Sequence, residues 1–283
     1  MNDAHSLQRR RIGGLLGFAG LTALLPPGLA RAAAPAPDVA RILQRKELLV
    51  AMLATDTPPF FYQRDGQLRG LDVDIAQDIA RELGVAVRFD RSAASFNAVV
   101  EQVARGEADL GISKISRTLA RARSVRFSTP YLTLHHALIL NRLEFARLAR
   151  DRSAEQALQH YSGSLGVIAK SSFEDFARSN FPRATLRSYP GWSEVVAAVE
   201  RGEVAGGYRD EFEVKRLLAE RPSLALRLRT VTLKDRDDTI GVVLHHDAPT
   251  LQSFVNLLLS MRRQTLRVDD VLKALPEATG GKA

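Results

Sequence analysis

The stretch VVEQVARGEADLGIS (99–113) decides the fold, because VVAAVERGEVAGGY (195–208) repeats its plan 96 residues later. In each copy, valines at helical spacing predict an amphipathic helix. An Arg-Gly pair predicts the end of that helix, since glycine readily adopts the left-handed conformation found just after a helix. The small and apolar residues that follow predict a buried strand. Each copy is therefore half of an α/β unit.

The regions around the two copies alternate in the same way and predict two lobes. In the first series we expect strands at 48–53, 85–90 and 136–141, a helix at 72–84 and a hairpin-like segment at 62–70. In the second series we expect strands at 164–169, 184–189 and 224–231 and helices at 172–180 and 210–220. A strand at 239–246 and a helix at 249–264 have no counterpart in the second series, so we assign them to the first lobe. The chain then crosses between the lobes twice, and the hinge is expected near Leu138–Arg142 and Leu233–Thr239. Loops at the carboxyl ends of both sheets should face a shared cleft.

Composition limits the function. The chain has 283 residues, of which 45% are hydrophobic, which suffices for two cores. It has no cysteine, which excludes disulfides, thiolate metal sites and a thiol nucleophile. The formal net charge of +8 is spread along the chain, so we expect no nucleic-acid partner.

The N-terminus predicts export. Arg9, Arg10 and Arg11 precede the apolar stretch 12–30, and Ala30-Arg31-Ala32 fits a cleavage site, so residues 1–32 are interpreted as a signal peptide. The paired arginines leave the twin-arginine route open beside the Sec route. A membrane anchor is the alternative, but glycines and two prolines interrupt the stretch. We expect the mature chain in the periplasm.

Five motifs occur together in an order that carries a resemblance: TDTPPFFY (55–62), GLDVDIAQDIARELG (70–84), ARGEADLGIS (104–113), RTLARARSVRFSTPY (117–131) and RGEVAGGYRD (201–210). From about Leu48 to Leu272 the chain resembles family 3 bacterial solute-binding proteins. The resemblance implies an α/β, two-lobed periplasmic-binding-protein fold of type II, in which each lobe is a mostly parallel sheet flanked by helices. It places lobe 1 at 33–138 and 236–276, lobe 2 at 139–235 and a tail at 277–283.

The resemblance also implies a function. It predicts a monomeric receptor that closes on a small polar or acidic amino acid, or a related carboxylate, and delivers it to an inner-membrane ABC permease. No cofactor and no catalytic residue are implied. The implied ligand-binding residues are Asp56, Phe60, Lys114, Ser116, Arg121, Ser171, Ser172 and Asp210.

The resemblance gives these residues roles. Arg121 grips the ligand carboxylate with its planar guanidinium, helped by Ser116. Ser171 and Ser172 begin a helix whose backbone donors favour an anion. Asp210 pairs with the ligand ammonium. Asp56 contacts the ligand side chain, and Phe60 forms an aromatic wall.

Two lysines depart from the family pattern. Lys114 stands where the family has a small residue, and Lys170 replaces a glycine. With Arg117 and Arg121 close to Lys114, one hypothesis is a ligand that carries a second acid group or lacks an amine. The alternative is that Lys114 pairs with Asp56 and leaves an ordinary amino-acid site.

Structural roles compete with these assignments. Asp210, Ser171 and Ser172 are also typical helix caps. Arg121, taken without the resemblance, is interpreted as a solvated helix arginine among Arg117, Arg123 and Arg126. Asp72 and Asp74 are interpreted as acids of a first helical turn. The pairs His135-His136 and His245-His246 should not chelate a metal, because adjacent strand residues point to opposite faces.

Two other functions stay open. One is a periplasmic lyase similar to the cyclohexadienyl dehydratases, in which Asp56 or Glu211 would be the acid. The other is a sensing or partner-binding module that acts without transport.

Overall fold

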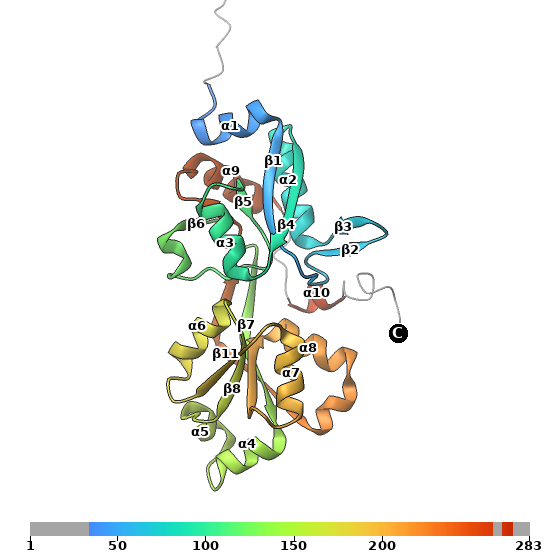
Figure 1. Ribbon diagram of the computed structural model, residues 1–283, viewed down its shortest axis with the longest axis vertical. Helices are drawn as coiled ribbons and strands as arrows, with labels where there is room; N and C mark the ends of the chain where they lie inside the picture. Colours follow the sequence, from blue (N-terminus) through green and yellow to red (C-terminus); the bar gives the residue numbers. More distant parts are fainter. Residues whose placement is uncertain (1–33, 263–267, 274–283) are drawn as a thin grey trace, which may run out of the picture. The chain divides into compact units, whose positions relative to one another are not determined.

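The structure is a computed structural model that describes residues 34–262 and 268–273 (Figure 1). The predicted signal peptide (1–32) and tail (277–283) lie outside the described residues. Within the described part, every helix is too short or too polar to cross a bilayer.

The first lobe contains a five-stranded sheet in the order β4-β1-β5-β12-β6. Its strands are β1 (Glu47–Leu53), β4 (Ala86–Ala93), β5 (Leu110–Gly111), β6 (Val125–Phe127) and β12 (Val243–His245). Strands β4, β1 and β5 are parallel, whereas β12 runs antiparallel to β5 and to β6. The accompanying elements are α1 (Pro37–Arg45), the hairpin β2 (Tyr62–Arg64) and β3 (Gln67–Arg69), α2 (Leu71–Leu83), α3 (Phe96–Ala104), η1 (Arg121–Arg123), α9 (Pro249–Met261) and α10 (Val268–Lys273).

The second lobe contains a five-stranded sheet in the order β11-β7-β10-β8-β9. Its strands are β7 (Leu132–Asn141), β8 (Ser164–Ile168), β9 (Thr185–Tyr189), β10 (Gly206–Asp210) and β11 (Leu228–Ile240). Its helices are α4 (Arg142–Ala149), α5 (Ala154–Gln159), α6 (Ser172–Asn180), α7 (Trp192–Glu200), α8 (Glu211–Glu220) and the turn η2 (Pro222–Leu226). Strands β9, β8 and β10 are parallel, and β7 and β11 are antiparallel additions. Both sheets are therefore mixed, with a parallel half and an antiparallel half.

The repeated phrase folds as predicted. Helices α3 and α7 end at Ala104 and Glu200, and the glycines that follow each Arg, Gly106 and Gly202, have φ angles of 73° and 72°. These angles lie in the left-handed region that favours glycine. Each helix is followed by a buried strand, β5 or β10.

A second pair of glycines explains why the copies share small residues in their strands. A Cβ on Gly111 would lie 2.9 Å from Val99 Cγ1, and one on Gly207 would lie 2.8 Å from Val195 Cγ1. Both glycine and valine recur with the 96-residue offset. The repeated segment therefore forms the same closely packed helix–strand pair in each lobe.

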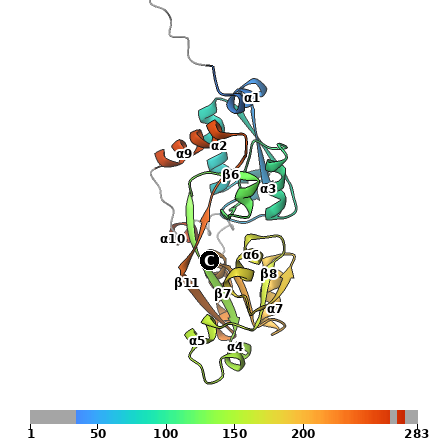
Figure 2. The same ribbon diagram turned by 90° about the vertical axis from the view of Figure 1, so that its left-hand side faces the viewer.

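The strands β7 and β11 connect the two sheets and differ from the prediction. They lie side by side from Leu132↔Ile240 to Asn141↔Leu228, with a register shift between Leu233 and Asp237 (Figure 2). The predicted strands 224–231 and 239–246 were wrong in extent. The first begins with the turn η2 and then continues without a break to Ile240, because β7 offers pairing partners along its length.

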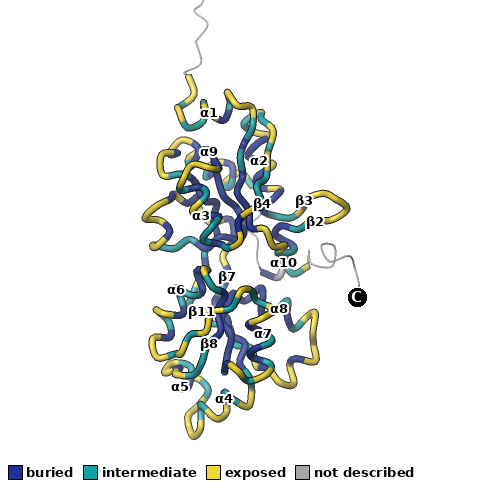
Figure 3. Tube along the Cα trace, viewed as in Figure 1, coloured by how far each residue is buried: buried dark blue, intermediate teal, exposed yellow. Residues whose placement is uncertain are grey.

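Buried residues follow the sheets (Figure 3). The core of the first lobe includes Leu132, Leu134 and Ile240 at the near ends of β7 and β11. It also includes Phe212 of α8 in the second lobe, which is 0% exposed. Its ring lies edge-on to Phe60, with centroids 5.1 Å apart. The two lobes are therefore in apolar contact.

Replacement of Gly207 by alanine should lower the free energy of unfolding by about 1–3 kcal/mol, because overpacking forces neighbours to shift. The new methyl would lie 2.8 Å from Val195 Cγ1 and 3.0 Å from Ile139 Cγ1. Urea unfolding followed by circular dichroism measures the change. The control is Gly191→Ala, whose methyl would meet only the end of the exposed Glu194 side chain. Equal stability of the two variants would contradict this close packing.

Candidate functional site

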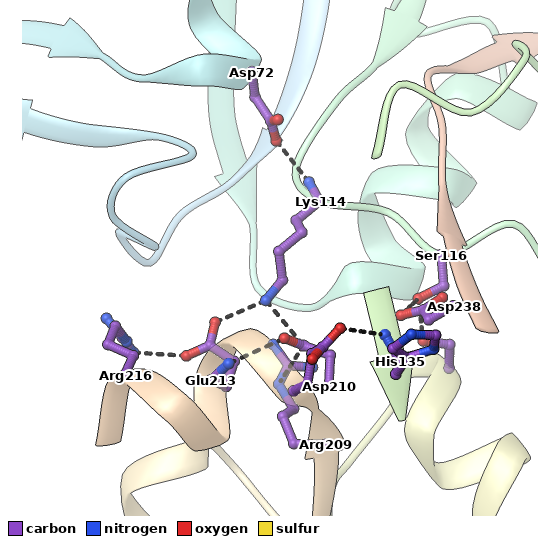
Figure 4. A network of polar contacts seen from close by, with 11 residues as sticks. Asp72, Lys114, Ser116, His135, Arg209, Asp210, Glu213, Arg216 and Asp238 are labelled. Carbon is purple, nitrogen blue, oxygen red and sulfur yellow. Dashed lines mark hydrogen bonds and ion pairs between the residues drawn. The ribbon is translucent and has the colours of Figure 1, made fainter. Parts of the chain in front are cut away.

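Lys114 lies at the centre of the polar contacts between the lobes (Figure 4). It follows β5 in the first lobe, and its backbone φ of 50° lies in the left-handed region. Its N–H donates to Asp72 Oδ2 at 2.6 Å. Its Nζ donates to Asp210 Oδ2 at 2.9 Å and to Glu213 Oε1 at 2.8 Å, both in the second lobe. The residue is only 4% exposed, so this ammonium is a buried link between lobes.

The two acids that hold Lys114 come from the start of α8. Asp210 ends β10 and caps α8, since its Oδ1 accepts the N–H of Glu213. The second carboxylate oxygen of Glu213 accepts a hydrogen bond from Arg216 at 2.7 Å. Burial by itself raises the pKa of Glu213, but the charges of Lys114, Arg216 and Arg209 outweigh it and lower the pKa to about 2. Glu213 is therefore ionised at neutral pH.

Aromatic rings complete the surroundings of the ammonium. Lys114 Nζ lies 5.1 Å from the ring centroid of Phe60 and 5.2 Å from that of Phe212. Both rings are fully buried, so they add a cation–π attraction in a desolvated place. Phe60, expected as a wall for the ligand, contacts the protein's own lysine.

The hydroxyls of Ser116 and Ser172 also meet across the lobes. Ser172 Oγ lies 2.8 Å from Ser116 Oγ, which donates to Asp238 Oδ2 on β11 at 2.9 Å. Ser171, expected as a cap or an anion-binding donor, turns its Oγ to the carbonyl of Ile168 at 2.7 Å. The serine hydroxyls are thus engaged with protein atoms.

Arg121 is buried instead of solvated, at 8% exposed. Its Nη1 donates to the carbonyl of Ser116 at 2.9 Å, and its Nη2 donates to Asn97 Oδ1 at 2.9 Å. Burial lowers the pKa of Arg121 to about 10, so the side chain stays charged at neutral pH. In this structure the guanidinium fastens the Ser116 loop to α3.

Asp72 and Asp238 are buried carboxyls that titrate near neutrality. Burial raises the pKa of Asp72 to about 7, against the opposing effect of its hydrogen bonds from Tyr131 and Lys114. Burial, reinforced by the charge of Asp210, raises the pKa of Asp238 to about 7. The expected role of Asp72 in the first turn of its helix was incomplete, because its carboxylate anchors the Lys114 loop.

A cavity of about 600 Å³ lies between the lobes. The first lobe contributes residues of the loops after β1 and β4, and the second contributes residues from β8, α7 and α8. Among the predicted ligand-binding residues only Asp56 lines the cavity. Asp56 pairs with Arg91 at 2.8 Å, so the suggested pair of Asp56 with Lys114 does not form.

Sequence reasoning missed the cavity wall apart from Asp56, including Phe96, Trp192 and Arg209. Arg209 is 5% exposed, and its guanidinium carbon lies 5.2 Å from the Phe96 centroid and 5.5 Å from the Phe173 centroid. Among the described residues, its Nε and the Trp192 Nε1 find no hydrogen-bond acceptor. The position of Arg209 beside Asp210, and of the only tryptophan at the start of the second repeated helix, was the available signal.

The histidine pairs behave differently from each other. On β7, His136 packs against Phe173, Phe176 and Tyr208, while His135 turns to Asp237, as the strand argument predicted. The argument was wrong for His245 and His246, whose ring centroids lie 4.0 Å apart, because β12 ends at His245. Together with Asp247 they form a group of possible metal ligands within the described chain, with two of the three residues exposed.

Replacement of Asp238 by asparagine should flatten the pH dependence of stability. With a pKa of about 7 in the folded state and about 4 unfolded, Asp238 keeps its proton only in the folded protein across that window, so stability falls as pH rises. The variant should reduce this slope by up to about 1.4 kcal/mol per pH unit. The slope is measured as the free energy of unfolding in urea at several pH values between 4 and 7.5, about two for each pH unit. Asp235→Asn, exposed on the same strand, is the control; identical slopes would contradict the assignment.

Comparisons with known proteins agree with this architecture. The model of the bacterial extracellular solute-binding proteins, family 3, matches residues 49–271. A "Probable histidine-binding protein" of Campylobacter jejuni is 23% identical over 171 residues, which cover 60% of this chain and 63% of that protein. The virulence sensor protein BvgS of Bordetella bronchiseptica is 30% identical over 184 residues, 61% of this chain and 14% of that protein. The chain thus spans less than two thirds of both relatives.

A solved structure is similar over a greater length. The amino acid ABC transporter substrate-binding protein AbpA of Streptococcus pneumoniae, bound to L-arginine, has a TM-score of 0.65 and 25% identity, covering 85% of this chain and 98% of that one. The two mixed sheets and the match over residues 49–271 lead to one conclusion: the chain belongs to the family 3 bacterial extracellular solute-binding proteins.

Proposed function

We propose that this protein is a periplasmic receptor that binds a small zwitterion, such as an amino acid, in the cavity between its lobes and delivers it to an ABC permease. The observation that carries the proposal is the cavity of about 600 Å³, which both lobes line and which has the buried Arg209 in its wall. A pocket of this size between domains is typical of small-molecule sites.

Arg209 is the proposed anchor for a ligand carboxylate. The ion pair with Asp210 is long, at 3.6 Å, and Nε has no hydrogen bond within the described residues. The stacking on Phe96 and Phe173 fixes the plane of the guanidinium, so its fork is held ready for a planar acceptor. Trp192 Nε1, which has no acceptor within the described part of the chain, offers a further donor.

The charges around the cavity favour a zwitterion over a strongly acidic ligand. Three arginines and four carboxylates line it: Arg209, Arg216, Arg221, Asp56, Glu194, Glu213 and Glu220. This near balance gives both an anion and a cation a partner, whereas a dicarboxylate would face an excess of negative charge. The histidine-binding description of one relative and the L-arginine in a similar structure support an amino acid with a basic side chain.

The lyase alternative finds less support in the site. A general acid must hold a proton near neutral pH and reach the substrate. Glu213 lines the cavity, but its pKa is lowered to about 2 against the effect of burial. Asp72 and Asp238, with a pKa of about 7 each, are absent from the cavity lining. Glu211 accepts the N–H of His135 and pairs with Lys215.

Ligand binding should change the fluorescence of Trp192, the only tryptophan, and raise the melting temperature. At a ligand concentration of about 100 Kd the rise should be about 5–10 °C, since binding then adds roughly 2.7 kcal/mol. The probes are L-arginine, L-histidine, L-glutamate and succinate. We expect a response to the basic amino acids and none to succinate.

A pair of variants tests the anchor. Arg209→Gln should weaken binding of the responding amino acid by about 10- to 100-fold, because a hydrogen bond to a charged group contributes about 1.5–3 kcal/mol. Arg123→Gln, exposed in η1, should bind like the wild type. A response to succinate alone would contradict the zwitterion proposal. No response to any probe would contradict the receptor proposal and favour a partner-binding module.

A further inference from the structure

We infer that Lys114 is a specificity-determining residue: it fills the acidic pair Asp210 and Glu213 with the protein's own ammonium, so that the lobes close without a ligand and a ligand's ammonium is excluded from that pair. The inference concerns a subsite next to the cavity and does not depend on which solute the cavity takes.

The first step is that the buried Lys114 ammonium is fully paired with the two carboxylates. Nζ lies within 2.9 Å of one carboxylate and 2.8 Å of the other, and all three side chains are at most 2% exposed. The Phe60 and Phe212 rings lie beside the ammonium. A buried charge is tolerated only when it is paired, and here each charge already has a partner. A second ammonium could enter only by displacing Lys114.

The second step is the direction of the side chain. The left-handed φ of 50° at Lys114 is a conformation that glycine adopts more readily than lysine. The N–H bond to buried Asp72 and the hydrogen bond of Asp72 with Tyr131 hold the backbone in this conformation. The first lobe thus aims the lysine at the second lobe instead of leaving it free to reach solvent.

The third step is that other contacts close the same interface. The Asn97 N–H donates to the carbonyl of Lys170 at 3.3 Å, and the hydroxyls of Ser116 and Ser172 lie 2.8 Å apart. Phe212 inserts into the first core. Every one of these contacts joins protein to protein, so closure needs no ligand atom. In a receptor whose ligand brings the cation, the ligand would supply the link that Lys114 supplies here.

The test uses Lys114→Gly, which removes the ammonium, leaves room in its place and suits the left-handed backbone. The melting temperature should fall by about 10 °C, because two buried carboxylates lose the cation that they share and keep only Arg216 and the more distant Arg209. Small-angle X-ray scattering should show a larger radius of gyration for the ligand-free variant than for the ligand-free wild type. The exposed Lys234→Ala is the control and should match the wild type in both measurements.

Chemical rescue makes the test specific. Ethylammonium chloride should raise the melting temperature and lower the radius of gyration of Lys114→Gly, whereas the same concentration of sodium chloride should not. The wild type should not respond to ethylammonium. A variant with wild-type melting temperature and radius, or one that ethylammonium does not affect, would overturn the inference.

If Lys114→Gly does not fold, the double variant Asp210→Asn, Glu213→Gln removes the acids and keeps the lysine. It should also have a larger ligand-free radius of gyration than the wild type, and an unchanged radius would overturn the inference. Because the wild type is tested with ethylammonium as well, binding elsewhere in the cavity is distinguished from rescue of the acidic pair. Failure of the amino-acid probes therefore bears only on the proposed receptor function, and failure of the rescue only on Lys114.

Discussion

The ammonium of Lys114 lies between two carboxylates, and all three side chains are almost completely buried. Because an unpaired charge in such a place is strongly destabilising, the surrounding structure has to keep these groups together. Its partner Asp210 also caps α8, and Glu213 is in turn held by Arg216. On the opposite side, Asp72 fixes the loop that carries the lysine. The two ion pairs of Lys114 therefore tie the start of α8 to the loop after β5, and residues of the same helix line the cavity beside them.

The sequence alone was sufficient to predict the helix–strand connections of the two repeated segments. The ends of α3 and α7, just before Gly106 and Gly202, could be predicted from the conformational freedom of glycine. The α/β order could be predicted from the short buried strands that follow amphipathic helices. The length of β11 was not predictable in the same way. Its polar residues near Asp237 look like a loop, but β7 supplies hydrogen-bonding partners that override this local preference. Similarly, His246 lies one residue past the end of β12, and the face of its ring depends on where that strand stops.

The site was predicted in its loops but not in its pairings. The motifs pointed to the loops that carry Ser116, Ser172 and Asp210, which do meet between the lobes. Which charge would pair with Lys114 depended on the reach of a long side chain across two lobes. Its partners are Asp210 and Glu213, whereas Asp56 pairs with Arg91. Arg209 escaped notice because its position beside Asp210 does not reveal that its guanidinium lies over the rings of Phe96 and Phe173.

The paired strands β7 and β11 also limit how the lobes can move. Two separate connecting segments would act as independent tethers and would permit rotation about several axes. Here the segments are hydrogen-bonded to each other on both sides of the irregularity between Leu233 and Asp237. A two-stranded ribbon bends across its flat face at little cost, whereas sliding one strand past the other breaks its ladder. The ribbon therefore favours bending of one lobe toward the other over a sliding motion between them.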